Sequence, residues 1–317
     1  MLKKYSQTVF KLIGYLSFTT CAFLISLFFV FPYPILSEYL VAKAKQANIL
    51  LSIHSIQPSL SGIKANGIQI SPASLKPEIE LGKLHMDSLS LRPSLFSSKL
   101  ITNIKIAKGN IQLATGIFNA KEMSIDAKGI DLSQINFSAL LWMLSPEIYN
   151  SGTATPQLDM EGVLTHAHIS FSIPKNQKAS EAHGQWNMEL NEWVLKQGTL
   201  ALLLPNSKEP TPVDLPRIVF GNLKTSASIK KGHIQLSQLK TQSHELESEV
   251  LGNIHLDKNK KLADSQSNFT LRLQAQPELL ERLGILGSAV SLLPVDPQNP
   301  QWRSAQFQGP LSRLEMK

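Results

Sequence analysis

Residues 231–236 read KGHIQL, and this short phrase decides the fold class that the sequence predicts. A close copy, KGNIQL, stands at residues 108–113, and a looser one, LGNIHL, stands at residues 251–256. In each copy a glycine and a polar residue precede alternating apolar and polar residues. Glycine favours a turn, and strict alternation is typical of a strand with one apolar face. Each phrase therefore predicts a turn that leads into a β-strand.

The same alternation fills most of the chain between residues 49 and 125 and returns after residue 158. Apolar side chains occupy every second position, and Ser, Gln, Asn, Lys, Asp and His stand between them. Glycines separate the short strands at turn-like places. Because antiparallel strands can keep one face wet, the pattern predicts a mainly β protein built as a curved antiparallel β meander or groove.

Two stretches break the alternation and predict two short helices. Residues 131–152 space their apolar side chains at helical intervals, and residues 277–293 begin with a proline, which favours the first turn of a helix. The second stretch is almost long enough to cross a membrane. Glu278, Glu281 and Arg282 in its first two turns argue instead for a helix that lies on the sheet or on a partner.

The proline-rich residues 204–216, LPNSKEPTPVDLP, predict a surface loop. Proline lacks the N–H group that a central strand must donate, so this stretch does not fit inside a sheet. The loop is the best position for a possible subdivision of the β-rich region.

Residues 12–37, LIGYLSFTTCAFLISLFFVFPYPILS, contain no charged side chain. The stretch is longer than the roughly 20 residues that a helix needs to cross the hydrocarbon core of a bilayer. Lysines precede it, and a long polar region follows it, which is the plan of a signal anchor whose start stays in the cytoplasm. We therefore expect a cytoplasmic N-terminus (1–11), a transmembrane signal anchor (12–37) and a periplasmic β-rich domain (38–317).

Two alternatives concern this anchor. Residues 42–44, AKA, could form a small-residue cleavage site, but the apolar run exceeds the roughly 7 to 15 residues of a signal peptide, so cleavage stays open. Cys21 is the single cysteine, which excludes an internal disulfide and a cysteine metal cluster. The residues before it, 18–20, do not form a lipidation motif, so we expect Cys21 to be a small apolar residue of the membrane helix.

Composition and motifs argue against nucleic-acid binding and against catalysis. The formal net charge is +7, but the basic residues are scattered and aromatic residues make up only 7% of the chain, so no nucleic-acid partner is expected. The sequence contains no phosphate-binding glycine loop and no nucleophile elbow. We therefore expect no catalytic residues, no cofactor and no metal, and predict a protein that is not an enzyme.

His166 and His168 are the histidines that the sequence brings closest to a metal site, because a strand would point both to one face. Asp159 and Glu161 are the only further ligands nearby in the sequence. A third ligand is therefore not evident, and we expect both histidines to lie on the wet face without a metal.

An apolar face that runs over so many strands has to be covered, and two helices are few for this purpose. The face either closes into an ordinary core or forms a groove for lipid chains or a protein partner, and both possibilities stay open. The predicted groove-lining residues are Ile111, Leu113, Ile234, Leu236, Ile254 and Leu256.

Five longer phrases resemble the long form of the GspN family of type II secretion proteins. They are FVFPYP at residues 29–34 and the stretches at residues 53–71, 89–113, 232–256 and 271–284. The chain also resembles the wider group of AsmA-like envelope proteins, in which a membrane anchor precedes a repetitive β-rich domain with a lipid-compatible groove.

The resemblance to GspN implies a non-enzymatic, single-pass protein of the cell inner membrane, with the bulk of the chain in the periplasm. Such a protein would act through contacts with other type II secretion components. The alternative is an AsmA-like envelope protein that binds or transfers membrane lipids in its apolar β groove. Neither resemblance implies catalytic, cofactor-binding or metal-binding residues.

Overall fold

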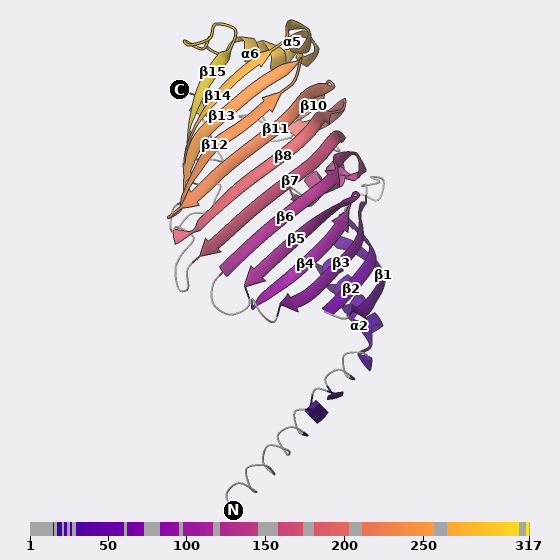
Figure 1. The fold of residues 1–317 in the computed structure, drawn as a ribbon. Helices are drawn as coiled ribbons and strands as arrows, with labels where there is room; N and C mark the ends of the chain where they lie inside the picture. Colours follow the sequence, from indigo (N-terminus) through magenta and orange to yellow (C-terminus); the bar gives the residue numbers. More distant parts are fainter. Residues whose placement is uncertain are drawn as a thin grey trace, which may run out of the picture.

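The structure is a computed structural model of the 317-residue chain. It describes residues 15, 18–20, 22–23, 26, 30–59, 62–72, 83–94, 98–116, 121–144, 158–173, 181–202, 211–256, 265–310 and 315–316. These residues form a mainly β protein with one large antiparallel sheet and few helices, as the sequence predicts (Figure 1).

Within the described residues the large sheet has fourteen strands. Neighbours in the sheet are consecutive in the chain, except that β8 pairs directly with β11, and all pairs are antiparallel. The strands are β1 (Ile49–Ser59), β2 (Gly62–Pro72), β3 (Leu84–Ser94), β4 (Lys99–Ile106), β5 (Gly109–Gly116), β6 (Lys121–Asp131), β7 (Met160–Ile173), β8 (His183–Leu195), β11 (Ile218–Lys230), β12 (His233–Gln242), β13 (Leu246–His255), β14 (Gln266–Ala275), β15 (Arg303–Pro310) and β16 (Glu315–Met316).

A separate two-stranded hairpin, β9 (Gly198–Leu202) and β10 (Thr211–Leu215), is inserted between β8 and β11. The prediction of a loop over residues 204–216 is therefore wrong for β10, whereas residues 203–210 lie outside the described part of the chain. Pro212 is compatible with β10 because a two-stranded ribbon leaves each strand with an open edge, where a missing N–H group is harmless.

The described helices are α2 (Tyr33–Gln46), the 3-10 helix η1 (Leu132–Gln134), α3 (Phe137–Leu144), α5 (Pro277–Leu283) and α6 (Ile285–Ser291). Asn136 begins α3, because its Oδ1 accepts a hydrogen bond from Ala139 N (2.8 Å). The prediction of two short helices is wrong in number. Gly284 adopts φ +56°, a backbone conformation that favours glycine, and it divides the expected second helix into α5 and α6.

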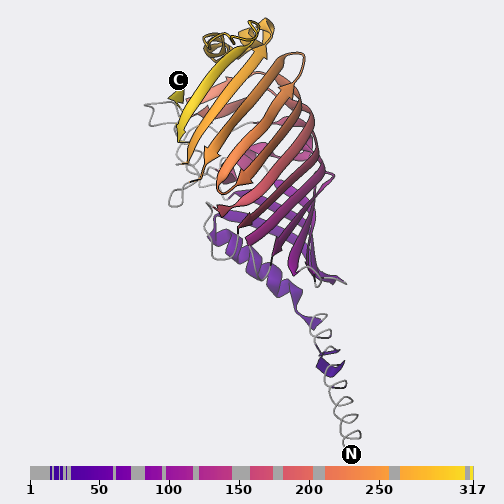
Figure 2. The same cartoon turned by 60° about the vertical axis from the view of Figure 1, so that its left-hand side comes forward.

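Eleven of the 26 residues of the predicted transmembrane anchor at residues 12–37 lie outside the described residues. The helix α2 includes its last residues, from Tyr33 on, and contacts β1. None of the helices in the described part of the chain combines the length and the apolar character that a membrane crossing requires. Figures 1 and 2 show α2 at one end of the molecule and α5 and α6 at the other.

Register gives the large sheet one apolar and one polar face. Residues directly opposite each other on neighbouring strands point to the same face. One line of such partners crosses the sheet from β1 to β15, and it consists of Ile56, Ala65, Leu89, Ile104, Ile111, Ala127, Ala167, Met188, Thr225, Leu239, Val250, Leu271 and Ala305.

Two further lines run beside it, and we call the three lines together the apolar face. The second line consists of Ile63, Leu91, Thr102, Leu113, Ile125, Ile169, Trp186, Ala227, Leu236, Gly252, Phe269 and Phe307. The third line consists of Leu100, Thr115, Met123, Phe171, Gly184, Ile229, Ile234, Ile254, Ser267 and Gly309.

The opposite side is the polar face. A line of partners there is mostly polar or charged, and it consists of Asn66, Ser88, Lys105, Asn110, Lys128, His166, Glu189, Lys224, Lys240, Glu249, Arg272 and Ser304. Cross-strand ion pairs form within it, including Lys224 Nζ to Glu189 Oε1 at 3.0 Å.

The three repeated phrases do not share one structure. The turn between β11 and β12 contains Gly232 at φ +74°, as expected for a glycine turn. The turn between β4 and β5 is formed by Ala107 and Lys108, both at positive φ, so Gly109 already begins β5. Gly252 lies inside β13. The interpretation of all three glycines as turn residues is therefore wrong for Gly109 and Gly252.

Close packing explains these two glycines instead. A Cβ atom on Gly109 would lie 2.6 Å from Cγ1 of Ile130. A Cβ atom on Gly252 would overlap the carbonyl oxygen of Asn268 on β14 and lie 2.5 Å from Cδ1 of Phe269. Such distances are too short for non-bonded atoms, so a side chain at either position would push neighbouring strands apart.

Substitution by asparagine should separate the two roles of glycine. Asparagine tolerates positive φ, so we expect Gly232→Asn to lower the free energy of unfolding by less than about 1 kcal/mol. Gly252→Asn should lower it by about 2 kcal/mol or more, because the new side chain has no space. Thermal melting of the two full-length variants measures the difference. Equal losses would contradict this assignment.

Candidate functional site: the apolar face of the large sheet

Along the first line of partners, the N-terminal half of the apolar face is covered by packed side chains, whereas its second and third lines are partly buried or, at Met123, exposed. Leu132 of η1 and Ile135 just after it pack against a buried cluster that extends from β2 to β7. The buried members of this cluster are Ala65, Ile68, Met86, Ile106, Ala107, Ala127, Ile130 and Ala167. This first line behaves as part of an ordinary hydrophobic core.

A second buried cluster closes one end of the C-terminal half. It consists of Leu158, Leu195, Ile218 and Leu279, with Phe137 of α3 packed against it. Leu279 comes from α5 and is only 1% exposed. The helix α5 therefore covers the strand ends at this position.

Glu245, in the turn between β12 and β13, holds α5 against the sheet. Its carboxylate accepts hydrogen bonds from Arg282 Nη2 (2.8 Å) and from Val219 N (3.0 Å). Arg282 also donates to the carbonyl oxygen of Arg217 (3.0 Å). Burial raises the pKa of Glu245, but the Val219 N–H group and the Arg282 guanidinium outweigh burial, so that the pKa is lowered.

Over β11 to β15 the apolar face is also only partly buried. Leu236, Phe269 and Phe307 lie in one line of partners on β12, β14 and β15, and all three are only partly buried. The fully buried residues of the three lines on these strands are small: Thr225, Ala227, Ser267 and Ala305. On these strands the buried residues of the apolar face are therefore small, and the large apolar side chains beside them stay partly exposed to solvent or to a ligand.

Large apolar side chains of this face are also exposed on earlier strands of the sheet. Trp186 on β8 is 38% exposed, and Met123 on β6 is 37% exposed. Both belong to the lines that define the apolar face. Water-exposed side chains of this size mark a surface that gains free energy when it is covered.

The register places five of the six predicted groove-lining residues on one face but in two groups, one on β5 and the other on β12 and β13, with β6, β7, β8 and β11 between them. Ile111, Leu113, Ile234, Leu236 and Ile254 all belong to the apolar face and are partly buried. The sixth, Leu256, follows the end of β13, where its N–H group donates to Gly232 O (2.9 Å).

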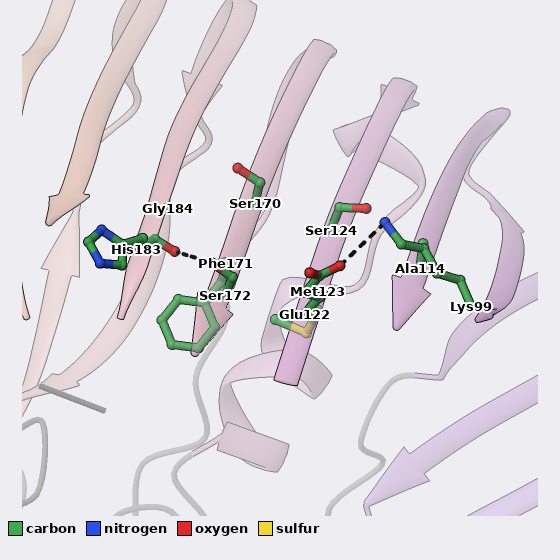
Figure 3. Close-up of a pocket in the computed structure, with 10 residues that line it drawn as sticks. All are labelled: Lys99, Ala114, Glu122, Met123, Ser124, Ser170, Phe171, Ser172, His183 and Gly184. Carbon is green, nitrogen blue, oxygen red and sulfur yellow. Dashed lines mark hydrogen bonds and ion pairs between the residues drawn. The ribbon is translucent and has the colours of Figure 1, made fainter. Parts of the chain in front are cut away.

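The polar face carries a shallow hollow of about 260 Å³ over β4 to β8 (Figure 3). At its rim Lys99 Nζ lies 3.6 Å from Glu122 Oε2, and Ser172 Oγ donates to His183 O at 3.5 Å. These polar groups bond to each other, and the hollow is open to solvent. It offers no converging set of nucleophile, acid and base among the described residues that line it.

His166 and His168 lie on the polar face of β7. His168 Nδ1 is 2.7 Å from Asp126 Oδ1 on β6, whereas His166 stands opposite Lys128 and Glu189. In the part of the chain that the structure describes, no three or more His, Cys, Asp or Glu side chains are grouped to hold a metal ion.

A second pair of neighbouring histidines could not be identified from the sequence. His233 begins β12 and His255 ends β13, 22 positions apart in the chain. Antiparallel pairing places them directly opposite each other, with their Nδ1 atoms 3.2 Å apart. The repeated phrases around them carried a signal for strands, but only the register of β12 on β13 identifies them as neighbours.

No family model matches this chain, and neither a curated protein nor a solved structure is significantly similar to it. The functional argument therefore depends on the sheet and its side chains.

Replacement of Glu245 by glutamine should loosen α5 and lower the free energy of unfolding by about 1 kcal/mol, a modest value because Arg282 is 40% exposed. A carboxylate with a lowered pKa stabilises the fold above its ordinary pKa, and this contribution disappears as the pH falls through the folded-state value. The melting difference between wild type and Glu245→Gln should therefore be present at pH 7 and smaller at an acidic pH below the folded-state pKa of Glu245.

Glu281→Gln is the matched control for this experiment, since Glu281 is an exposed residue of the same helix. It should melt like the wild type at both pH values. A melting difference for Glu245→Gln that persists in acid would show that the charge of Glu245 does not hold α5.

Proposed function

We propose that this chain is a membrane-anchored envelope protein that binds the acyl chains of lipids in a groove along its apolar face. The observation that carries the proposal is the row of partly buried large side chains over β11 to β15, represented by Leu236, Phe269 and Phe307.

The size of this surface suits an acyl chain. The strands β11 to β15 are separated by four spacings of about 4.8 Å, so a line across them is roughly 19 Å long. One leaflet of a bilayer has a hydrocarbon thickness of about 15 Å, half of the roughly 30 Å core. Each buried methylene contributes about 0.8 kcal/mol, so one chain in contact along this line gains several kcal/mol.

The chemistry of the groove favours an apolar ligand over a polar one. Polar side chains on this side of β11 to β15 are mainly hydroxyls. Thr225 Oγ1 is buried without a hydrogen-bond partner among the described residues, whereas three others are bonded within the protein. Ser267 Oγ donates to Gly309 O (2.8 Å), and the hydroxyl oxygens of Thr241 and Ser248 lie 2.8 Å apart. Few groups therefore remain to bind a charged or sugar-like ligand, which supports an aliphatic chain as the occupant.

The N-terminal segment supports the membrane anchor in this proposal. Phe18, Phe23 and Val30 are 73%, 64% and 77% exposed. Large apolar side chains exposed to this extent are unfavourable in water and favourable in lipid. We place residues 12–37 in the inner membrane as a single span, with residues 38–317 in the periplasm and α2 leading from the membrane to β1 (Figure 2).

A second candidate function is a component of a type II secretion system that acts through protein contacts. The phrases that resemble GspN favour it, and they include residues 232–256, which contain the whole of β12 and β13. In this case the side chains over β11 to β15 contact another secretion protein instead of lipid.

A matched pair of variants tests the lipid proposal. Phe269 lies on the apolar face, and its neighbour Asn268 is exposed on the polar face. Full-length protein in membranes is exposed to a phospholipid with a photoreactive acyl chain, and labelled peptides are identified by mass spectrometry. We expect labels on β11 to β15, a loss of about tenfold or more in Phe269→Glu because the introduced carboxylate repels the chain, and no loss in Asn268→Glu.

The two variants also distinguish the candidates. Labelling confined to residues 12–37 in the wild type would contradict the lipid proposal. If Phe269→Glu stays folded and abolishes secretion of type II cargo while Asn268→Glu does not, the same surface contacts a secretion partner.

The proposed topology predicts the location of a reporter. Alkaline phosphatase fused after Lys317 should be active, because it folds only after export, and a cytoplasmic reporter at the same position should be inactive. The opposite result would overturn the proposed localisation. Recovery of a mature N-terminus near residue 45 would replace the anchor by a cleaved signal peptide.

A further inference from the structure

We propose that His233 and His255 form a binding site for a divalent transition metal ion, such as Zn²⁺ or Cu²⁺, on the polar face of the sheet. Their Nδ1 atoms are 3.2 Å apart, and their ring centroids are 4.3 Å apart. The site lies on the face opposite to the proposed groove and does not depend on lipid binding.

The fold fixes this pair through the apolar face. Ile234 and Ile254 are directly opposite each other in the same two strands and point to the apolar face. Because side chains alternate along a strand, their neighbours His233 and His255 must point together to the polar face. A shift of one residue between β12 and β13 would move the isoleucines to the polar face, so the register is strongly specified.

The separation of the two nitrogens suits one shared ion. A metal to imidazole nitrogen distance of about 2.0 to 2.1 Å places two ligands about 3.3 Å apart in tetrahedral geometry and about 2.9 Å apart at a right angle. The observed 3.2 Å lies between these values. Without a metal the same contact is a hydrogen bond between the two imidazoles, so a bound ion replaces the shared proton and turns both rings, which are tilted by 40°, toward itself.

The surroundings decide which ions bind and how tightly. Both histidines are exposed, so the ion keeps water molecules as its other ligands. Lys230 stands opposite His233, and its positive charge weakens binding. Gln235 and Asn253, opposite each other and next along the polar face, offer only neutral amides. Two imidazoles select Cu²⁺ and Zn²⁺ over Mg²⁺ and Ca²⁺, which prefer oxygen ligands.

Metal titration of the full-length protein, purified in detergent without a histidine tag, tests this site. We expect one Zn²⁺ or Cu²⁺ to bind per chain, with tighter binding of Cu²⁺ and none of Mg²⁺. His233→Asn and His255→Asn should each weaken binding about tenfold or more. Zn²⁺ should raise the Tm of the wild type and leave the Tm of both variants unchanged, because a bound ion links β12 to β13.

His183→Asn is the control, because His183 is an exposed histidine on the same face of β8 and stands opposite Lys230. It should bind metal like the wild type. A spectroscopic measurement does not depend on the variants: the paramagnetic resonance spectrum of the Cu²⁺ complex should show coupling to two imidazole nitrogens.

Three results would overturn the proposal. They are no stoichiometric binding to the wild type, undiminished binding to His233→Asn or His255→Asn, and coupling to fewer than two nitrogens in the Cu²⁺ spectrum. Loss of binding in His183→Asn would move the site elsewhere on the polar face.

Discussion

The rest of the structure depends on the register of antiparallel neighbours. Because nearly every strand pairs with the next one in the chain, a single line of partners runs from Ile56 on β1 to Ala305 on β15. Side chains alternate between faces, so a slip of one residue in any pair would reverse every later strand relative to the apolar face. The irregular register between Leu236 and Leu239 preserves this order, since both residues reach the apolar face although they are three positions apart.

A sheet with this register separates two environments along its whole width. The polar and charged groups of the polar face are exposed to water or form cross-strand ion pairs, such as Lys224 with Glu189. The apolar face is not stabilised by contact with water, and within the described residues the buried clusters cover its first line over the N-terminal strands and one end of its C-terminal half. The Glu245–Arg282 pair holds α5 at that end. The partly buried large side chains over β11 to β15, like those of the second and third lines over the N-terminal strands, lie outside these clusters, and packing alone does not explain them.

Alternation in the sequence predicted the strands and the common face of residues such as Ile111 and Ile234, because a period of two is a local property. Three features could not be predicted in this way. Gly284 breaks a helix through a backbone conformation that apolar spacing does not reveal, and Gly252 is required by the approach of Phe269 from another strand. His233 and His255 meet only through a pairing between strands, which single-chain periodicity does not contain.

The two faces also explain how one sheet can hold two independent sites. In β12, His233 and Ile234 are adjacent in sequence, yet one points to the proposed metal site and the other to the proposed groove. Both sites consist of strand side chains, and the pairing of the strands alone places these side chains next to each other. The two sites use side chains on opposite faces of the same strands, so a substitution in one site leaves the side chains of the other in place.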